Sequence, residues 1–326
     1  MKRNRFLLAI LVLAFVLVQC ENEEDEELLG NWTERSDFEG LPRSNAVCFE
    51  INGKAYVGTG YDGDDYLSDF WEFDPNTNFW KKIADFPGDA RSDAVGFSIE
   101  NKGYIGTGYN GDDKLNDFWE YEPGSNSWTR KADFGGSARY AAMGFSIGDK
   151  GYIGTGYDGN ELKDFWAYDP ASNSWEQKIS LGGSKRRDAV GFVIDGKGYV
   201  CTGRHNGALD DELWEYNPEL DVWVEKKELD YDDDYAVIRA SSISFVFNGK
   251  GYVGTGEKGG VSVDIWEYDP VYDLWQQKTS FEGTARMDAV GFSIDNAGYI
   301  TTGRSSSYYF DDIWAFDPNA EYEEED

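Results

Sequence analysis

The chain has 326 residues and a formal net charge of −32 at pH 7, with 30 Lys and Arg against 62 Asp and Glu. A field of that sign repels polyanions, so we expect no nucleic acid among its partners. Hydrophobic residues make up 40% of the chain and aromatic residues 16%, which is enough for a folded core. The only histidine is His205, which excludes a metal centre with two imidazole ligands. We expect no metal and no other cofactor.

The N-terminal segment is typical of a targeting signal. Residues 1–5 are basic, residues 6–18 are an unbroken apolar run, and Cys20 follows. The run is too short to span a bilayer and fits the core of a signal peptide. An apolar run that ends at a lone cysteine resembles a bacterial lipoprotein signal, in which that cysteine becomes the lipidated first residue of the mature chain. The alternative is an ordinary secretory signal with an incidental cysteine.

This resemblance implies a lipid anchor at Cys20 and a membrane location. The protein would then be attached to the outer membrane of a Gram-negative bacterium, on its surface or its periplasmic side. We divide the chain into a signal peptide (1–20), an acidic tether (21–28), a repeat domain (29–318) and an acidic C-terminal tail (319–326). The tether is either a surface-sorting segment or a solvated linker.

A repeat of about 48 residues fills the third of these segments. Each copy opens with an arginine, and successive arginines are 48, 48, 47, 53 and 47 residues apart. In the second copy, four β-rich runs follow at 91–99, 101–108, 117–123 and 127–128, and we label such runs A to D in each copy. Short β-rich runs separated by turn residues predict a four-stranded antiparallel unit. The repeat arginines are Arg43, Arg91, Arg139, Arg186, Arg239 and Arg286.

Run A has two different faces. Val95, Phe97 and Ile99 alternate with Ala94, Gly96 and Ser98, so one face is bulky and the other is nearly flat. Neither face suits water. The pattern predicts sheets that stack the bulky face of one on the flat face of the next, as propeller blades do.

The twelve tryptophans predict the number of blades. Six lie in run C and five in run D, and the sixth copy ends at Pro318 without a run D. Trp32 lies 11 residues before Arg43, the same spacing that separates Trp80 from Arg91. We therefore expect residues 29–35 to supply the missing outer strand of the last blade and to close a six-bladed ring.

The repeats resemble the kelch family of β-propellers. The matching features are the arginine before run A, the Lys-Gly-Tyr at the start of run B, and the Tyr-Asp-Pro that precedes the tryptophan of run D. Run B ends in Thr-Gly in all six copies, where kelch repeats usually have Gly-Gly; this indicates a bacterial branch. The resemblance covers residues 29–318 and implies an all-β fold, a six-bladed β-propeller of four-stranded repeats closed by its N-terminal strand.

The variable loops between runs B and C and between runs D and A share one face of such a propeller, and ligands usually bind at variable loops. The repeat arginines begin the innermost strands, so we expect them to line the mouth of the central channel on that face and to bind a carboxylate or another small anion. The alternative is a structural role, in which each arginine pairs with a carboxylate or carbonyl of a neighbouring blade.

Several residues on these loops depart from the repeat and are ligand-binding candidates. Arg204 and Arg304 replace the tyrosine that usually follows Thr-Gly, and His205 lies beside the first of them. The longest loop between runs D and A contains Tyr231 and Tyr235. Two further departures, Cys48 and Cys201, replace glycines, and we expect both to be buried thiols.

Two classes of function remain open. The first, which we favour, is a monomeric binding module that offers its loop face to a glycan, peptide or protein. The second is a sugar-active enzyme, because the resemblance includes sialic acid mutarotases; Glu257 or His205 would then move the anomeric proton. The related copper oxidases need two histidines and are excluded.

Overall fold

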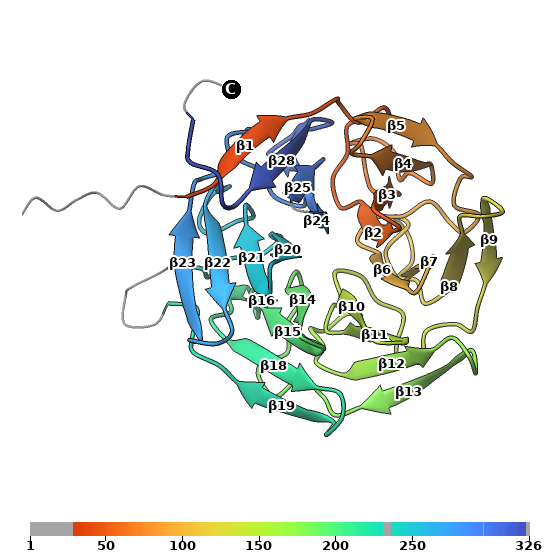
Figure 1. Cartoon of the computed structure of the whole chain (residues 1–326). Helices are drawn as coiled ribbons and strands as arrows, with labels where there is room; N and C mark the ends of the chain where they lie inside the picture. Colours follow the sequence, from red (N-terminus) through yellow and green to blue (C-terminus); the bar gives the residue numbers. More distant parts are fainter. Residues whose placement is uncertain (1–28, 231–235, 296, 324–326) are drawn as a thin grey trace, which may run out of the picture.

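Six antiparallel sheets of four strands surround a central axis in the computed structural model, which describes residues 29–230, 236–295 and 297–323 (Figure 1). Each sheet is one blade, with its first strand innermost and the others following outward. The described residues form strands, turns and loops, and none lies in a helix that could cross a membrane. The predicted all-β, six-bladed propeller is therefore confirmed.

The strands match the four predicted runs of each repeat. The first three blades contain β2 (Val47–Ile51), β3 (Lys54–Gly58), β4 (Phe70–Asp74) and β5 (Phe79–Lys82); β6 (Val95–Ile99), β7 (Lys102–Gly106), β8 (Phe118–Glu122) and β9 (Ser127–Arg130); and β10 (Met143–Ile147), β11 (Lys150–Gly154), β12 (Phe165–Asp169) and β13 (Ser174–Lys178). The next two contain β14 (Val190–Ile194), β15 (Lys197–Cys201), β18 (Leu213–Asn217) and β19 (Val222–Glu225); and β20 (Ile243–Phe247), β21 (Lys250–Gly254), β22 (Ile265–Asp269) and β23 (Leu274–Lys278). Two short hairpins, β16–β17 (Arg204–His205 and Ala208–Leu209) and β26–β27 (Arg304–Ser305 and Tyr308–Tyr309), lie in the B–C loops of the fourth and sixth blades.

The last blade joins the two ends of the propeller. It contains β24 (Val290–Ile294), β25 (Ala297–Thr301), β28 (Ile313–Asp317) and, as its outer strand, β1 (Asn31–Glu34). β1 pairs antiparallel with β28 and places Trp32 opposite Phe316. Figure 1 shows the red β1 beside the dark blue β28. The predicted closure by the N-terminal strand is confirmed, and it removes the free edge that β28 would otherwise expose.

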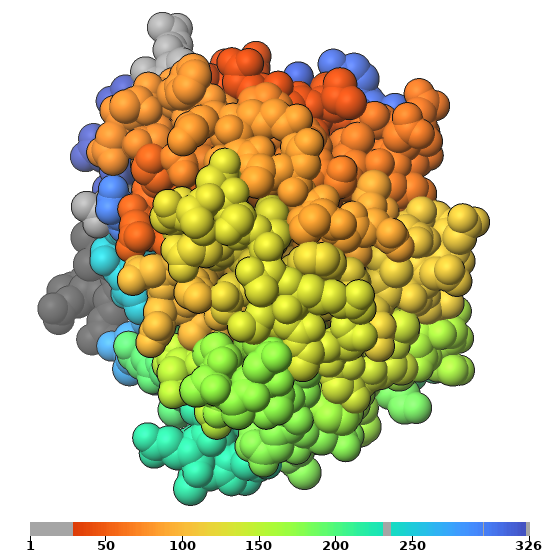
Figure 2. Space-filling view, turned by 90° about the vertical axis from the view of Figure 1, so that its right-hand side faces the viewer, coloured from red at the N-terminus to blue at the C-terminus, as the bar shows by residue number. Residues whose placement is uncertain are grey.

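Adjacent blades pack through the alternation predicted from run A. The bulky residues of β6 are buried, and the ring of Phe97 lies against Gly151 of the next blade, where a Cβ would collide with it. The same contact joins Phe49 to Gly103 in the preceding pair of blades. The side view in Figure 2 shows successive blades, coloured from orange through yellow to green, following one another around the rim. Each glycine thus gives the neighbouring ring the space that close packing requires.

Candidate functional site at the channel mouth

The repeat arginines are fully buried and do not line the channel mouth. Arg139 is representative: Nη1 and Nη2 donate to the two carboxylate oxygens of Asp164, each at 2.7 Å, and Nη1 also donates to the Thr155 carbonyl at 2.9 Å. The prediction of a ring of exposed guanidinium groups is wrong, because an acidic residue just before the third strand of the blade draws each side chain inward. The equivalent carboxylates are Asp69, Asp117, Asp210 with Glu212, Asp264 and Asp312.

These contacts give the arginines a structural role. Each guanidinium holds a carboxylate of its own blade, rather than of a neighbouring one as the alternative prediction supposed. The main chain of the same residue joins two blades: the Arg91 amide donates to the Leu67 carbonyl, and the Arg91 carbonyl accepts from the Gly60 amide at 2.7 Å. Arg239 is the least tightly paired, at 3.7 Å from Asp264, and burial lowers its pKa to about 10. The six buried arginines therefore do not belong to the candidate site.

A closed ring of backbone hydrogen bonds surrounds the mouth of the channel. Its members lie two positions after each arginine, and all six have left-handed backbone conformations with φ between 52° and 57°. Each amide donates to the carbonyl of its counterpart in the preceding blade, at distances of 2.9 to 3.2 Å. These amides have no capacity left for an anion. The ring consists of Asn45, Asp93, Ala141, Asp188, Ser241 and Asp288.

Three carboxylates project from this ring, on alternate blades, and line the mouth. Asp93 accepts hydrogen bonds from Asn45 Nδ2 at 2.7 Å and Ser92 Oγ at 2.6 Å. Burial, with the charges of Asp288 and Asp188, raises the pKa of Asp93 to about 7. Burial also raises the pKa of Asp188 to about 6. The floor of the site is therefore a set of carboxylates of which two titrate near neutral pH.

We expect Asp93→Asn to raise the melting temperature by a few degrees at pH 8 and to leave it nearly unchanged at pH 4. An unfolded aspartate has a pKa of about 3.9, so the raised folded pKa makes Asp93 increasingly destabilising as the pH rises from about 4 to about 7. The neutral amide removes that cost. Calorimetry at both pH values measures the effect, with Asp112→Asn on an exposed loop as the control. A variant that is less stable than wild type at pH 8 would contradict the prediction.

An arc of six tyrosines borders the mouth. Consecutive ring centroids are 5.0 to 6.2 Å apart, and all six side chains are half-buried. Burial is the main cause of the raised pKa of Tyr140, and the nearby charges of Asp93 and Asp188 raise it further. This phenol therefore lies close to the carboxylates of the mouth. The arc runs through the sixth, first, second and third blades, in the order Tyr309, Tyr61, Tyr66, Tyr109, Tyr140 and Tyr157.

Two hydroxyls in this arc stiffen their own loops, and four are left for other partners. Tyr61 donates to the Gly63 carbonyl at 2.6 Å, and Tyr109 donates to that of Gly111. Within the described part of the chain, the other four hydroxyls form no hydrogen bond. The arc therefore combines apolar ring faces with free hydrogen-bonding groups.

The predicted candidates Arg204 and Arg304 lie at the mouth, but each already holds a carboxylate. Arg204 pairs with Glu257 of the next blade, and Arg304 Nε donates to Asp288 at 2.9 Å. His205 is also engaged, since Nδ1 donates to a main-chain carbonyl at 2.6 Å and Nε2 accepts from Asn206 at 2.7 Å. The remaining candidates, Tyr231 and Tyr235, lie outside the described residues, as does Cys20.

Arg187 is a site residue that the sequence prediction missed. Its guanidinium carbon lies 5.2 Å from the centre of the Tyr157 ring, and its nearest carboxylate contact is Nε to Asp188 at 3.6 Å. Its guanidinium forms no hydrogen bond to the described residues, and Nε is buried without a partner. A signal was present: Arg187 follows the repeat arginine at a position where the other copies have Ser, Ser, Tyr, Ala and Met.

The two cysteines differ in their surroundings. Cys201 is buried as predicted, whereas Cys48 is only half-buried, because its strand lines the central channel. Burial nevertheless raises the pKa of the Cys48 thiol well above its usual value. Glu50, on the same strand, accepts a hydrogen bond from the Ser293 amide of the last blade at 2.9 Å and has a pKa raised by burial to about 7.

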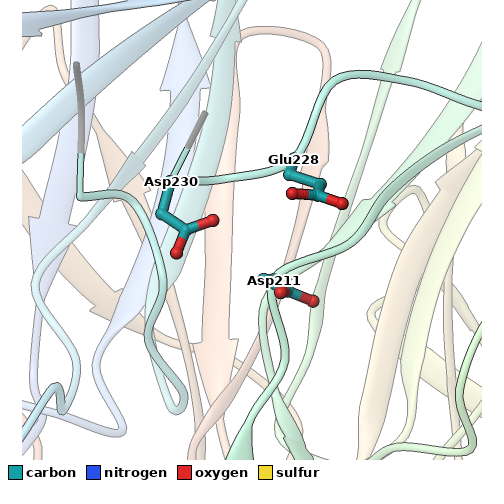
Figure 3. Close-up of side chains that lie close together, drawn as sticks. All are labelled: Asp211, Glu228 and Asp230. Carbon is teal, nitrogen blue, oxygen red and sulfur yellow. The ribbon is translucent and has the colours of Figure 1, made fainter. Parts of the chain in front are cut away.

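A separate acidic cluster lies away from the mouth. One carboxylate oxygen from each of Asp211, Glu228 and Asp230 lies within 4.8 Å of the other two (Figure 3). Two of the three residues are exposed. Exposed carboxylates commonly gather without an ion, so this cluster carries no assignment.

Comparison with known proteins agrees with the architecture. The KLHDC2/KLHL20/DRC7 Kelch-repeats domain matches residues 35–185. The solved structure of YjhT is similar, with a TM-score of 0.72 over 86% of this chain and 96% of that chain, at 16% identity. That identity supports a likeness of fold alone. No curated protein matches the sequence. The chain is therefore a six-bladed β-propeller, and residues 35–185 of it match a kelch-repeats domain.

Proposed function

We propose that this propeller is a binding module of the cell envelope and that it holds a glycan at the channel mouth. The arc of six tyrosines is the observation that carries the proposal. A phenol offers an apolar ring face and a polar tip, which suits the alternating C–H and hydroxyl surface of a sugar. These side chains lie on variable loops, outside the hydrophobic core that the blades share.

The charges at the mouth favour a sugar over a simple anion. Asp188 pairs with Arg187 and Asp288 pairs with Arg304, whereas the hydrogen-bond partners of Asp93 are uncharged, so the mouth presents both carboxylates and guanidinium groups. Carboxylates accept and guanidinium groups donate, and the two together match the paired hydrogen bonds of sugar hydroxyls. Unlike Arg204 and Arg304, Arg187 forms no guanidinium hydrogen bond to the described residues, and we place it against the ligand.

We expect Arg187→Ala to weaken glycan binding by about tenfold or more, since a hydrogen bond to a charged group contributes about 1.5–3 kcal/mol. Tyr140→Ala should weaken it less, since a hydrogen bond between neutral groups contributes about 0.5–1.5 kcal/mol. The melting temperature should change little, because neither side chain belongs to the core. A glycan array identifies the sugar, and titration calorimetry with that sugar measures the loss. The exposed Arg130 and Tyr322 provide matched alanine controls. Unchanged binding by both site variants would place the glycan elsewhere.

A sugar-active enzyme is the second candidate, and the raised pKa values of Asp93 and Asp188 are the observation in its favour. Groups that titrate near neutral pH and face a shared cavity are suited to general acid–base catalysis. An epimerase or mutarotase needs such groups to move a proton. An anomerisation assay on any sugar that binds distinguishes the two functions: catalysis that is lost in Asp93→Asn and Asp188→Asn would favour the enzyme.

The envelope location rests on the lipoprotein-like signal. We expect Cys20→Ser to move the protein from the membrane fraction to the soluble fraction, because stable attachment requires the multiple acyl chains of a lipidated cysteine. Cell fractionation with immunoblotting measures the change, and Cys48→Ser is the control that should leave the distribution unaltered. Wild-type protein found entirely in the soluble fraction would contradict the anchor.

A further inference from the structure

An apolar stripe lies on the outer edge of the fourth and fifth blades. The described residues include few large apolar side chains that are exposed, and most of them gather in this region. The most exposed are Val271 at 83% and Tyr272 at 71%, in the turn between β22 and β23. We define the stripe by Ile179, Leu220, Val222, Val224, Val271, Tyr272 and Leu274.

Hydrogen bonds between blades make this stripe continuous. The Ile179 amide donates to Asp221 at 3.2 Å, and the Ile179 carbonyl accepts from Trp223 at 3.1 Å, so Ile179 lies beside β19. At the other end of β19, the Lys227 amide donates to Asp273 at 3.2 Å, next to the turn of the fifth blade. The stripe therefore follows one strand from end to end and continues onto the adjacent blade.

The apolar residues of the stripe stand at positions where the other blades have small or polar residues. The equivalent turn has Gly124-Ser125 in the second blade and Ala171-Ser172 in the third, against Val271-Tyr272 in the fifth. The outward-facing positions of β9 are Ser127 and Thr129, whereas those of β19 are Val222 and Val224. Basic residues at an edge are a common protection against edge pairing, and β5 and β9 have Lys81, Lys82 and Arg130 at positions where β19 has Val224 and Glu225.

We propose that β19 is a docking edge for an extended segment of a partner protein that alternates apolar and basic residues. Among the described strands, β19 pairs only with β18, so its outer edge is open for a fifth strand. Val222 and Val224 would then pack beside alternate side chains of the added strand. The exposed Glu219, Glu225 and Glu228 border the same edge, and their charge selects a basic partner over a second copy of this acidic chain.

The test uses synthetic heptapeptides that alternate lysine with valine, glutamate with valine, or lysine with glycine. We expect the Lys-Val peptide to bind wild-type protein and to shift the amide resonances of Val222 and Val224. The double variant Val222→Lys/Val224→Lys should lose at least tenfold in affinity. The matched control Ser127→Lys/Thr129→Lys, on the equivalent edge of the second blade, should bind as wild type does.

Other outcomes overturn the proposal. Equal binding of the Lys-Val and Lys-Gly peptides, or equal binding by the two double variants, would show a general attraction between charges instead of strand addition. If the Lys-Val peptide does not bind the wild-type protein, β19 is not a docking edge. Sedimentation of the protein without peptide measures its oligomeric state. A wild-type dimer that is absent in Val222→Lys/Val224→Lys would show that the stripe binds a second copy of the chain instead.

Discussion

Arg139→Ala is expected to lower the stability of the propeller by about 3–5 kcal/mol, the usual effect of removing one partner from a buried ion pair. The side chain is fully buried, and it donates to both oxygens of Asp164 and to the Thr155 carbonyl. Burial alone would raise the pKa of Asp164, but the hydrogen bonds and charge of Arg139 outweigh burial and lower it. The variant would therefore leave an ionised, partly buried carboxylate without its cation.

Chemical denaturation at neutral pH measures this loss. Arg130→Ala is the control, because Arg130 pairs with Asp133 on the surface and both side chains are about half exposed. Ion pairs between exposed side chains contribute little to stability, so the control should unfold almost as wild type does. Equal stability of the two variants would show that the repeat arginines are not structural clamps.

Trp32→Ala is expected to cost about 3–5 kcal/mol, the usual range for removing a large aromatic side chain from a core. Trp32 is fully buried, stacks on Phe316 at a centroid distance of 4.5 Å, and meets Phe281 edge-on at 4.9 Å. Because β1 is the outer strand of the last blade, the cavity would weaken the contact that joins the two ends of the propeller.

Thermal unfolding followed by circular dichroism measures the effect of Trp32→Ala. Thr33→Ala, in the same strand but exposed to solvent, is the matched control and should change the melting temperature little. Deletion of residues 29–35 should destabilise the protein at least as much as Trp32→Ala. A deletion that leaves the melting temperature unchanged would mean that β28 does not need its outer partner.

The sequence alone determined the architecture, because the same local pattern recurs in every copy. Alternation in run A specified which face of each strand is bulky, and glycines marked where the next blade packs. The position of Trp32, equivalent to Trp80, was enough to predict closure of the ring. These features depend on neighbours within one repeat or on the identical repeat next to it, so they can be read without knowing the fold of the whole chain.

Only the tertiary structure decided which charged groups are available at the mouth. Arg139 and Asp164 are 25 residues apart, and their pairing depends on how the first and third strands of a blade are placed. Arg204 meets Glu257 across a blade boundary, whereas Arg187 lies 3.6 Å from Asp188 and forms no guanidinium hydrogen bond to the described residues. Charge interactions between loops depend on distances of a few ångströms. Composition and spacing do not determine such distances, so the fold was predictable and the charge pairing of the candidate site was not.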